Sequence, residues 1–186
     1  MSLEELWQLF TIFLEEHNKD WAAWYKEESR RIQSFLPANQ LLKMHHIGST
    51  SIKGIWAKPI IDILLEIPRS EDIGSIKRKL LEYGYLPMSE SEGRMSFNKG
   101  YTLQGFAERV FHLHLRYHGD HDELYFRDYL QDHPAVAKDY EQLKLILWKK
   151  YEHNRDAYTA AKTEFIRQYT QKAQKLYEGR YDDKLA

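Results

Sequence analysis

Hydrophobic and polar residues alternate, or gather in short apolar runs, in several segments of the chain, a pattern typical of β-strands. Strands are expected over residues 41–47, 60–67, 85–88, 94–101 and 109–118. The last of these reads RVFHLHLRYH, in which His112, His114 and Arg116 share one face and the apolar residues share the other. Such a strand covers a core with one face and leaves the other face open.

Other segments repeat their apolar residues every three or four positions, which predicts helices. Helices are expected in the second half of residues 1–36, over residues 73–83, from Pro134 and from Asn154. Gly84 is expected to end the 73–83 helix as a left-handed cap, and the tail from Tyr177 is expected to fray. The first half of residues 1–36 is ambiguous, because residues 9–14 would also serve as a strand.

Strands mixed with helices, followed by helices alone, predict an α+β fold. We expect a mixed β-sheet packed with helices and extended by C-terminal helices. The length favours a single domain over residues 1–186, with residues 134–186 as its helical C-terminal part.

Composition narrows the range of partners. The formal net charge is −1, so no overall positive field would hold a polymeric nucleic acid. There is no cysteine among the 186 residues, which excludes disulfides, thiolate metal sites and a catalytic thiol. No segment approaches the roughly 18 uninterrupted apolar residues of a membrane helix, and MSLEELWQLF is unlike a signal peptide. We therefore expect a cytoplasmic protein with no membrane partner.

One acidic residue stands inside the apolar part of the strand IIDILLEI. Asp62 needs a partner there, because an ionised carboxylate in an apolar layer costs on the order of several kcal/mol. Glu66 is on the same strand face but about 13 Å away, too far to hold the same metal ion. His112 and His114 could converge with Asp62 on one cation from a neighbouring strand. A strand histidine is more often a hydrogen-bonded structural residue, and this alternative stays open.

A glycine and three hydroxyl residues separate the 41–47 strand from the Asp62 strand. Gly48, Ser49, Thr50 and Ser51 have the chemistry of a turn that caps a short helix, and also that of a phosphate cradle. The turn alone is the more common arrangement. Followed by a strand with an inward Asp62, however, the backbone N–H groups and hydroxyls would face a metal carboxylate, and phosphate would fit between them.

Several long blocks of the chain resemble the GrpB family, a branch of the nucleotidyltransferase-fold superfamily. The blocks are HIGSTSIKGIWAKPIIDILLEI, the LHL stretch, FRDYLQDHPAVAKDYEQLKLIL and AYTAAKTEFI, and they extend over nearly the whole chain. The segment WAAWYKEE, with Trp21, Tyr25 and Glu28, is similar to the family's entry helix. The resemblance implies a nucleotidyltransferase-like sheet.

The superfamily is known for a hydrophobic-Gly-Ser signature, then a strand with Asp-hydrophobic-Asp/Glu, then a third carboxylate on a later strand. Residues 47–49 match the signature and Asp62 matches the first acid, but Leu64 stands in place of the second. His112 and His114 stand in place of the third. The resemblance thus implies a divalent metal ion held by Asp62, His112 and His114, with Asp62 as the catalytic carboxylate.

One carboxylate with two imidazoles favours manganese or zinc over magnesium, which prefers oxygen ligands. The implied ligand is a nucleoside triphosphate or another phosphorylated small molecule. Lys58 and Arg127 could neutralise its phosphates, Lys58 as a point charge and Arg127 as a two-pronged donor. Arg127 could instead belong to a structural network with Asp128 and Lys162, in a helix that packs on the sheet.

Three functions remain open. The leading hypothesis is a metal-dependent enzyme that transfers a nucleotidyl group to an unknown acceptor. A catalytically degenerate module that binds a nucleotide or supports a partner is the alternative, favoured by Leu64. A weaker possibility is hydrolytic or oxygen chemistry at a two-histidine, one-carboxylate site. The roles of Glu28, Asp128 and His133 stay unassigned.

Overall fold

A five-stranded mixed sheet forms the centre of the protein in a computed structural model that describes residues 8–182. Its strands are β1 (Lys43–Ile47), β2 (Ile60–Ile67), β3 (Leu86–Ser91), β4 (Arg94–Thr102) and β5 (Gly105–Tyr117). The order across the sheet is β1-β2-β5-β4-β3. The β2 and β5 strands run parallel, and the other neighbours run antiparallel. Two strands distant in sequence therefore lie together at the centre.

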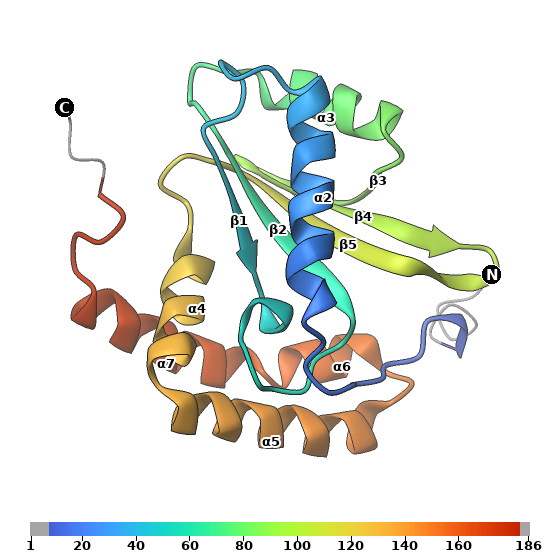
Figure 1. The fold of residues 1–186 in the computed structure, drawn as a ribbon, viewed down its shortest axis with the longest axis vertical. Coiled ribbons are helices and arrows are strands. Elements are labelled where there is room, and N and C mark those ends of the chain that lie inside the picture. Colours follow the sequence, from blue (N-terminus) through green and yellow to red (C-terminus); the bar gives the residue numbers. More distant parts are fainter. Residues whose placement is uncertain (1–7, 183–186) are drawn as a thin grey trace.

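Helices pack on both faces of this sheet. They are α2 (Asp20–Phe35), the 3-10 turn η1 (Ser49–Ser51), α3 (Ile73–Glu82), α4 (Asp122–Asp132), α5 (Pro134–Tyr151), α6 (Arg155–Ala160) and α7 (Thr163–Leu176). Figure 1 shows α2 running across one face of the sheet, and α5, α6 and α7 gathered at one end of it. Within residues 8–182, none of the helices combines the length and the apolar character needed to span a bilayer.

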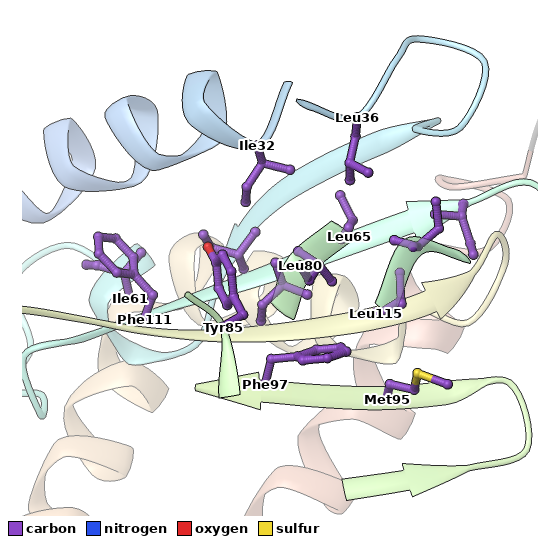
Figure 2. Packing of buried hydrophobic residues seen from close by; sticks show 14 of the residues in the cluster. Ile32, Leu36, Ile61, Leu65, Leu80, Tyr85, Met95, Phe97, Phe111 and Leu115 are labelled. Atoms are coloured by element: carbon purple, nitrogen blue, oxygen red, sulfur yellow. The ribbon is translucent and has the colours of Figure 1, made fainter. Parts of the chain in front are cut away.

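The main core lies between the sheet and helices α2 and α3. Ile61, Ile63 and Leu65 of β2 are fully buried there. Figure 2 shows Ile32 of α2, and Leu36 directly after this helix, facing the sheet. Each such side chain stabilises the fold by about 1.5–3 kcal/mol. This apolar layer fixes which face of β2 is turned inward and leaves the Asp62 face for the other helices.

Most predicted elements are confirmed. The 60–67 strand has the expected bounds, and Gly84 follows α3 with φ 84°. Residues 11–14, however, form neither helix nor strand. Phe10, Ile12 and Leu14 are buried in a segment that is held by an isolated bridge between Glu15 and Ala57 and by a hydrogen bond from the Ile12 N–H to the Glu152 carbonyl at 3.1 Å. The part of this prediction over residues 1–7 lies outside the described residues.

The single helix expected after Asn154 is wrong, because two helices, α6 and α7, occupy this region. Their junction is Ala161 and Lys162. The Lys162 N–H bonds to the Thr159 carbonyl at 3.2 Å, a tighter i to i+3 connection than the α-helical one. This turn brings the Lys162 side chain to the wall of the cavity described below.

Glu28 on α2 is buried in the core and has two partners. The Tyr85 hydroxyl donates to Glu28 Oε1 at 2.7 Å, and Lys99 Nζ donates to the same oxygen at 2.6 Å. Burial and the Glu28 charge raise the pKa of Tyr85 well above its ordinary value, so the phenol stays a donor. Glu28 therefore stabilises the attachment of α2 to the sheet.

We predict that Tyr85→Phe lowers the free energy of unfolding by about 1–3 kcal/mol, because it removes a hydrogen bond to a buried charge. Urea denaturation measures this loss. Tyr83→Phe is the matched control, because Tyr83 is 49% exposed. Equal stability of the two variants would contradict the role given to Glu28.

Candidate functional site

The parallel register of β2 and β5 places Asp62 opposite His112, and Leu64 opposite His114. His114 Nε2 lies 3.2 Å from Asp62 Oδ1, and His112 Nδ1 lies 3.5 Å from the same oxygen. The three residues that sequence parity pointed to are thus brought together on one face of the sheet. Their side chains are only partly exposed, between 19% and 26%.

Electrostatics favour an ionised Asp62 beside a neutral imidazole. Burial raises the pKa of Asp62, but hydrogen bonds and charge from His112 and His114 outweigh it, so the pKa lies well below its ordinary value. Burial lowers the pKa of His112, although Asp62 opposes the shift. A carboxylate and a neutral imidazole are the protonation states that bind metal ions.

His112 is also oriented from its other side. Its Nε2 lies 2.8 Å from the Tyr101 hydroxyl and 3.3 Å from Arg155 Nη2. Arg155 also donates to the Tyr101 hydroxyl at 2.7 Å. These contacts hold the ring so that Nδ1 faces Asp62.

The turn between β1 and β2 requires glycine at its first position. Gly48 has φ 70°, and a Cβ there would lie 2.4 Å from Asp62 Oδ2. The Ser51 hydroxyl donates to the Gly48 carbonyl at 2.6 Å, and Thr50 Oγ1 donates to the Ile60 carbonyl at 3.1 Å. The turn is therefore held by its own hydroxyls directly against Asp62.

A cavity of about 750 Å³ opens beside Asp62. Of the residues predicted from sequence, seven line it: Gly48, Ser49, Thr50, Lys58, Asp62, His112 and His114. Ser51 and Arg127 do not. The C-terminal helices add four cationic side chains to the cavity wall: Lys144, Arg155, Lys162 and Arg167. The acidic residues Asp122 and Glu123 also line the cavity.

Three cavity lysines have lowered pKa values. Burial lowers the pKa of Lys58 far below its ordinary value, and the charges of Lys162 and Arg155 lower it further. Burial and Lys162 lower the pKa of Lys144 to about 7, and burial is the main cause that lowers that of Lys162 to about 8. Within residues 8–182, the ammonium groups of Lys58 and Lys162 form no ion pair or hydrogen bond, and both lie over the Tyr158 ring.

Sequence reasoning missed Lys144 and Arg155, and treated Lys162 only as a structural partner of Arg127. Lys144 had a signal: it lies one turn after Tyr140 in the apolar stripe of α5, a position that faces the interior. Arg155 and Lys162 lie at helix boundaries, where periodicity says little about direction.

Arg127 is engaged elsewhere. It donates to Asp128 Oδ1 at 2.9 and 2.7 Å and to the His46 carbonyl at 3.1 Å. Arg180 donates to Asp128 Oδ2 at 2.9 Å, and the Tyr181 hydroxyl also binds Asp128. The tail up to residue 182 is therefore attached to α4, and the prediction that it frays from residue 177 is wrong for this part.

The remaining unassigned residue, His133, is held within its own helix turn. Its Nδ1 lies 2.8 Å from the Tyr129 carbonyl, and its ring stacks on the Tyr129 ring with centroids 3.9 Å apart. His133 does not line the Asp62 cavity.

Further along the same face of β2, Glu66 lies among histidines. Ligand atoms of Glu66, His118 and His121 are all within 4.8 Å of one another, close enough for one metal ion. Among residues 8–182, this is the group of three residues whose ligand atoms lie this close together. The ligand atoms of Asp62, His112 and His114 are not all within 4.8 Å of one another in this structure. No sequence rule pointed to Glu66 as a ligand, since His118 and His121 lie beyond the end of β5.

A sequence model of the family described as "GrpB protein" matches residues 11–172. The chain belongs to the GrpB family. The glutamate-rich protein GrpB of Alkalihalophilus pseudofirmus is 33% identical over 161 residues, which cover 83% of this chain and 91% of that protein. The UPF0157 protein YqkA of Bacillus subtilis is 34% identical over 169 residues, or 88% of this chain. This GrpB chain spans only 48% of YqkA.

Solved structures confirm the fold. The crystal structure of GrpB from Enterococcus faecalis has a TM-score of 0.78 and 30% identity, and the match covers 89% of this chain and 99% of that one. The Cid1 poly(U) polymerase has a TM-score of 0.50 with 12% identity, over 80% of this chain and 47% of Cid1. This GrpB chain therefore has the nucleotidyltransferase-like α+β fold that its sequence blocks implied.

We predict that Gly48→Ala destabilises the fold for two reasons. The left-handed backbone conformation alone costs a residue with a side chain about 1–2 kcal/mol. The loss should exceed this amount, because the new methyl group would also collide with the Asp62 carboxylate. Gly84→Ala is the matched control: Gly84 has φ 84°, and no atom lies within 4 Å of the point that a Cβ would occupy. Thermal denaturation of the two variants compares them. An equal loss in both would show that Asp62 does not constrain the turn.

Proposed function

We propose that this GrpB chain binds a nucleoside triphosphate, together with a divalent metal ion, in the cavity beside Asp62. The observation that carries the proposal is the group of half-buried and buried cations on its wall, whose pKa values are lowered by burial and by one another. Neighbouring ammonium groups repel, and a polyanion among them would relieve this repulsion. The volume lies within the range of about 300–1,000 Å³ typical of ligand pockets.

The Gly48 turn would take one part of the phosphate chain. Gly48, Ser49 and Thr50 line the cavity, and Gly48 keeps the backbone close to Asp62. Lys58 and Lys162 would take the opposite part, since neither ammonium group has an acidic partner within the described residues. Arg127 is not part of this proposal, because its guanidinium already binds Asp128.

Asp62, with His112 and His114, would hold the metal ion. The donor set of one oxygen and two nitrogens suits manganese or zinc better than magnesium. A small rotation of the imidazoles would be needed, because both nitrogens now face the same carboxylate oxygen. When bound, such an ion supplies positive charge that polarises a phosphoryl group.

The fold supports transfer of a nucleotidyl group as the reaction. The Cid1 structure that shares the fold is described as MgGTP bound. In such a reaction an acceptor hydroxyl forms a bond to the α-phosphorus and pyrophosphate leaves, with the acceptor proton passing to a base or water. Asp62 would be the carboxylate that holds the metal ion beside the phosphate in this chain.

A second candidate function is a binding module without turnover. Leu64 occupies the position of the second acid, is fully buried, and packs against Ile47 and Leu124. The chain therefore offers no carboxylate there for a second ion. Nucleotide binding with no released pyrophosphate under any divalent metal would select this function.

The proposal is tested by a thermal-shift panel that crosses the four nucleoside triphosphates with manganese, zinc and magnesium. A ligand at about 100 times its Kd adds about 2.7 kcal/mol, which raises Tm by about 5–10 °C at this size. Asp62→Asn should lose the metal-dependent part of the rise. No shift with any combination would refute nucleotide binding.

We predict that Lys58→Gln and Lys162→Gln each weaken triphosphate binding by about 10- to 100-fold, the effect of losing one charge-assisted contact. Titration calorimetry measures the change. Lys149→Gln serves as the control, because Lys149 is an exposed lysine of α5 and does not line the cavity. A similar loss in all three would point to overall charge instead of the cavity.

We also predict that binding weakens as pH rises from about 6 to about 9. Lys144 and Lys162 have pKa values of about 7 and about 8, so both lose their protons in this window. A bound polyanion favours the protonated forms, and affinity is therefore highest on the acid side. Lys162→Arg stays charged and should show a shallower pH dependence, and comparing it with the native chain cancels the titration of the ligand itself.

A further inference from the structure

A second cluster of ligand atoms surrounds Glu66. Glu66 is fully buried near the end of β2, about 13 Å along the strand from Asp62. Three histidines approach it from different segments: His45 from β1, and His118 and His121 from the connection between β5 and α4. None of these four residues lines the Asp62 cavity.

One oxygen of the Glu66 carboxylate, Oε1, has three close contacts. His121 Nδ1 lies 2.9 Å and His118 Nδ1 3.1 Å from Oε1. The Gly119 N–H donates to the same oxygen at 3.2 Å. Two imidazole nitrogens and a carboxylate oxygen thus converge from a strand and a turn.

The other oxygen is not satisfied. His45 Nε2 lies 3.3 Å from Glu66 Oε2, but outside hydrogen-bond geometry, so both atoms are buried without a hydrogen-bond partner within the described residues. Each such unsatisfied buried atom destabilises the folded state. A cation beside the carboxylate would compensate both atoms, because it accepts electron pairs from oxygen and nitrogen alike.

We infer that Glu66, His118 and His121 form a second metal site, built for zinc, with His45 beside it as a further ligand. Zinc binds imidazole nitrogen at about 2.0–2.1 Å and carboxylate oxygen at about 2.0–2.2 Å in a tetrahedron, which places ligand atoms about 3.4 Å apart. The observed separations of 2.9 and 3.1 Å need only a small opening of the cluster. Two imidazole ligands argue against calcium and magnesium, because both ions prefer oxygen ligands.

This zinc would be structural. Glu66 and His121 are buried, and the site ties β1, β2 and the start of α4 to one point. Closed sites with protein ligands are typical of structural zinc, whereas catalytic zinc keeps a position open to substrate. The inference is independent of nucleotide binding at Asp62.

The experiment measures zinc in the Asp62→Asn variant, so that the Asp62 site cannot contribute. The chelator-treated full chain is loaded with zinc alone, passed through gel filtration and analysed by mass spectrometry for metal content. We expect about one zinc per chain and a higher Tm than in the zinc-free protein. Cobalt in place of zinc should give the absorption spectrum of four-coordinate cobalt.

Glu66→Gln and His118→Gln, each added to Asp62→Asn, should abolish stoichiometric zinc and the rise in Tm. His118→Gln keeps the test usable if Glu66→Gln does not fold, because the His118 side chain is 20% exposed and the Glu66 side chain 0%. Far-ultraviolet circular dichroism checks the fold of each. Absence of zinc from Asp62→Asn, or its retention in a folded Glu66→Gln or His118→Gln variant, overturns the inference.

Discussion

The parallel pairing of β2 with β5 is the constraint on which the rest of the structure depends. One face of β2 is wholly apolar and buried under α2 and α3, so its register cannot slip. A shift by one residue would place Asp62 and Glu66 in that apolar core, at a cost on the order of several kcal/mol for each unpaired buried charge. The two acids are therefore held on the opposite face, where each must find compensation.

The cations near Asp62 are not equivalent, and the difference separates structure from function. Lys144 is 2% exposed and donates to the Trp56 carbonyl, while its neighbour Glu141 accepts from the Trp56 N–H at 2.7 Å. These bonds attach α5 to the loop before β2. The ammonium groups of Lys58 and Lys162 form no hydrogen bond or ion pair within the described residues, and both lie over the Tyr158 ring. The bond to Trp56 gives Lys144 a structural role, whereas no such bond accounts for Lys58 and Lys162.

Sequence reasoning found the half of the site that depends on strand parity. The alternation along each strand placed Asp62, His112 and His114 on open faces, and the sheet order brought those faces together. The orientation of the side chains that it missed is determined at turns and helix ends. Lys162 reaches the cavity through the tight turn between α6 and α7, which no periodic pattern encodes. Of the three histidines around Glu66, His118 and His121 lie past the end of β5, where the chain leaves the sheet and parity no longer applies, and His45 lies on β1.

Leu64 separates the two acids and gives each a different environment. It is fully buried between them and packs on Ile47 and Leu124, so the face of β2 is open at Asp62 and closed at Glu66. The superfamily pattern that the sequence resembles has a second acid at this position, and Leu64 offers no carboxylate for a second metal ion there. Under the proposed function, the positive charge beyond a single metal ion would come from the chain itself, from the lysines that line the Asp62 cavity. Leu64 and the cavity lysines are then two sides of one arrangement, because a strand without the second carboxylate has no partner for a second metal ion, and fixed cations would balance the phosphate charge instead.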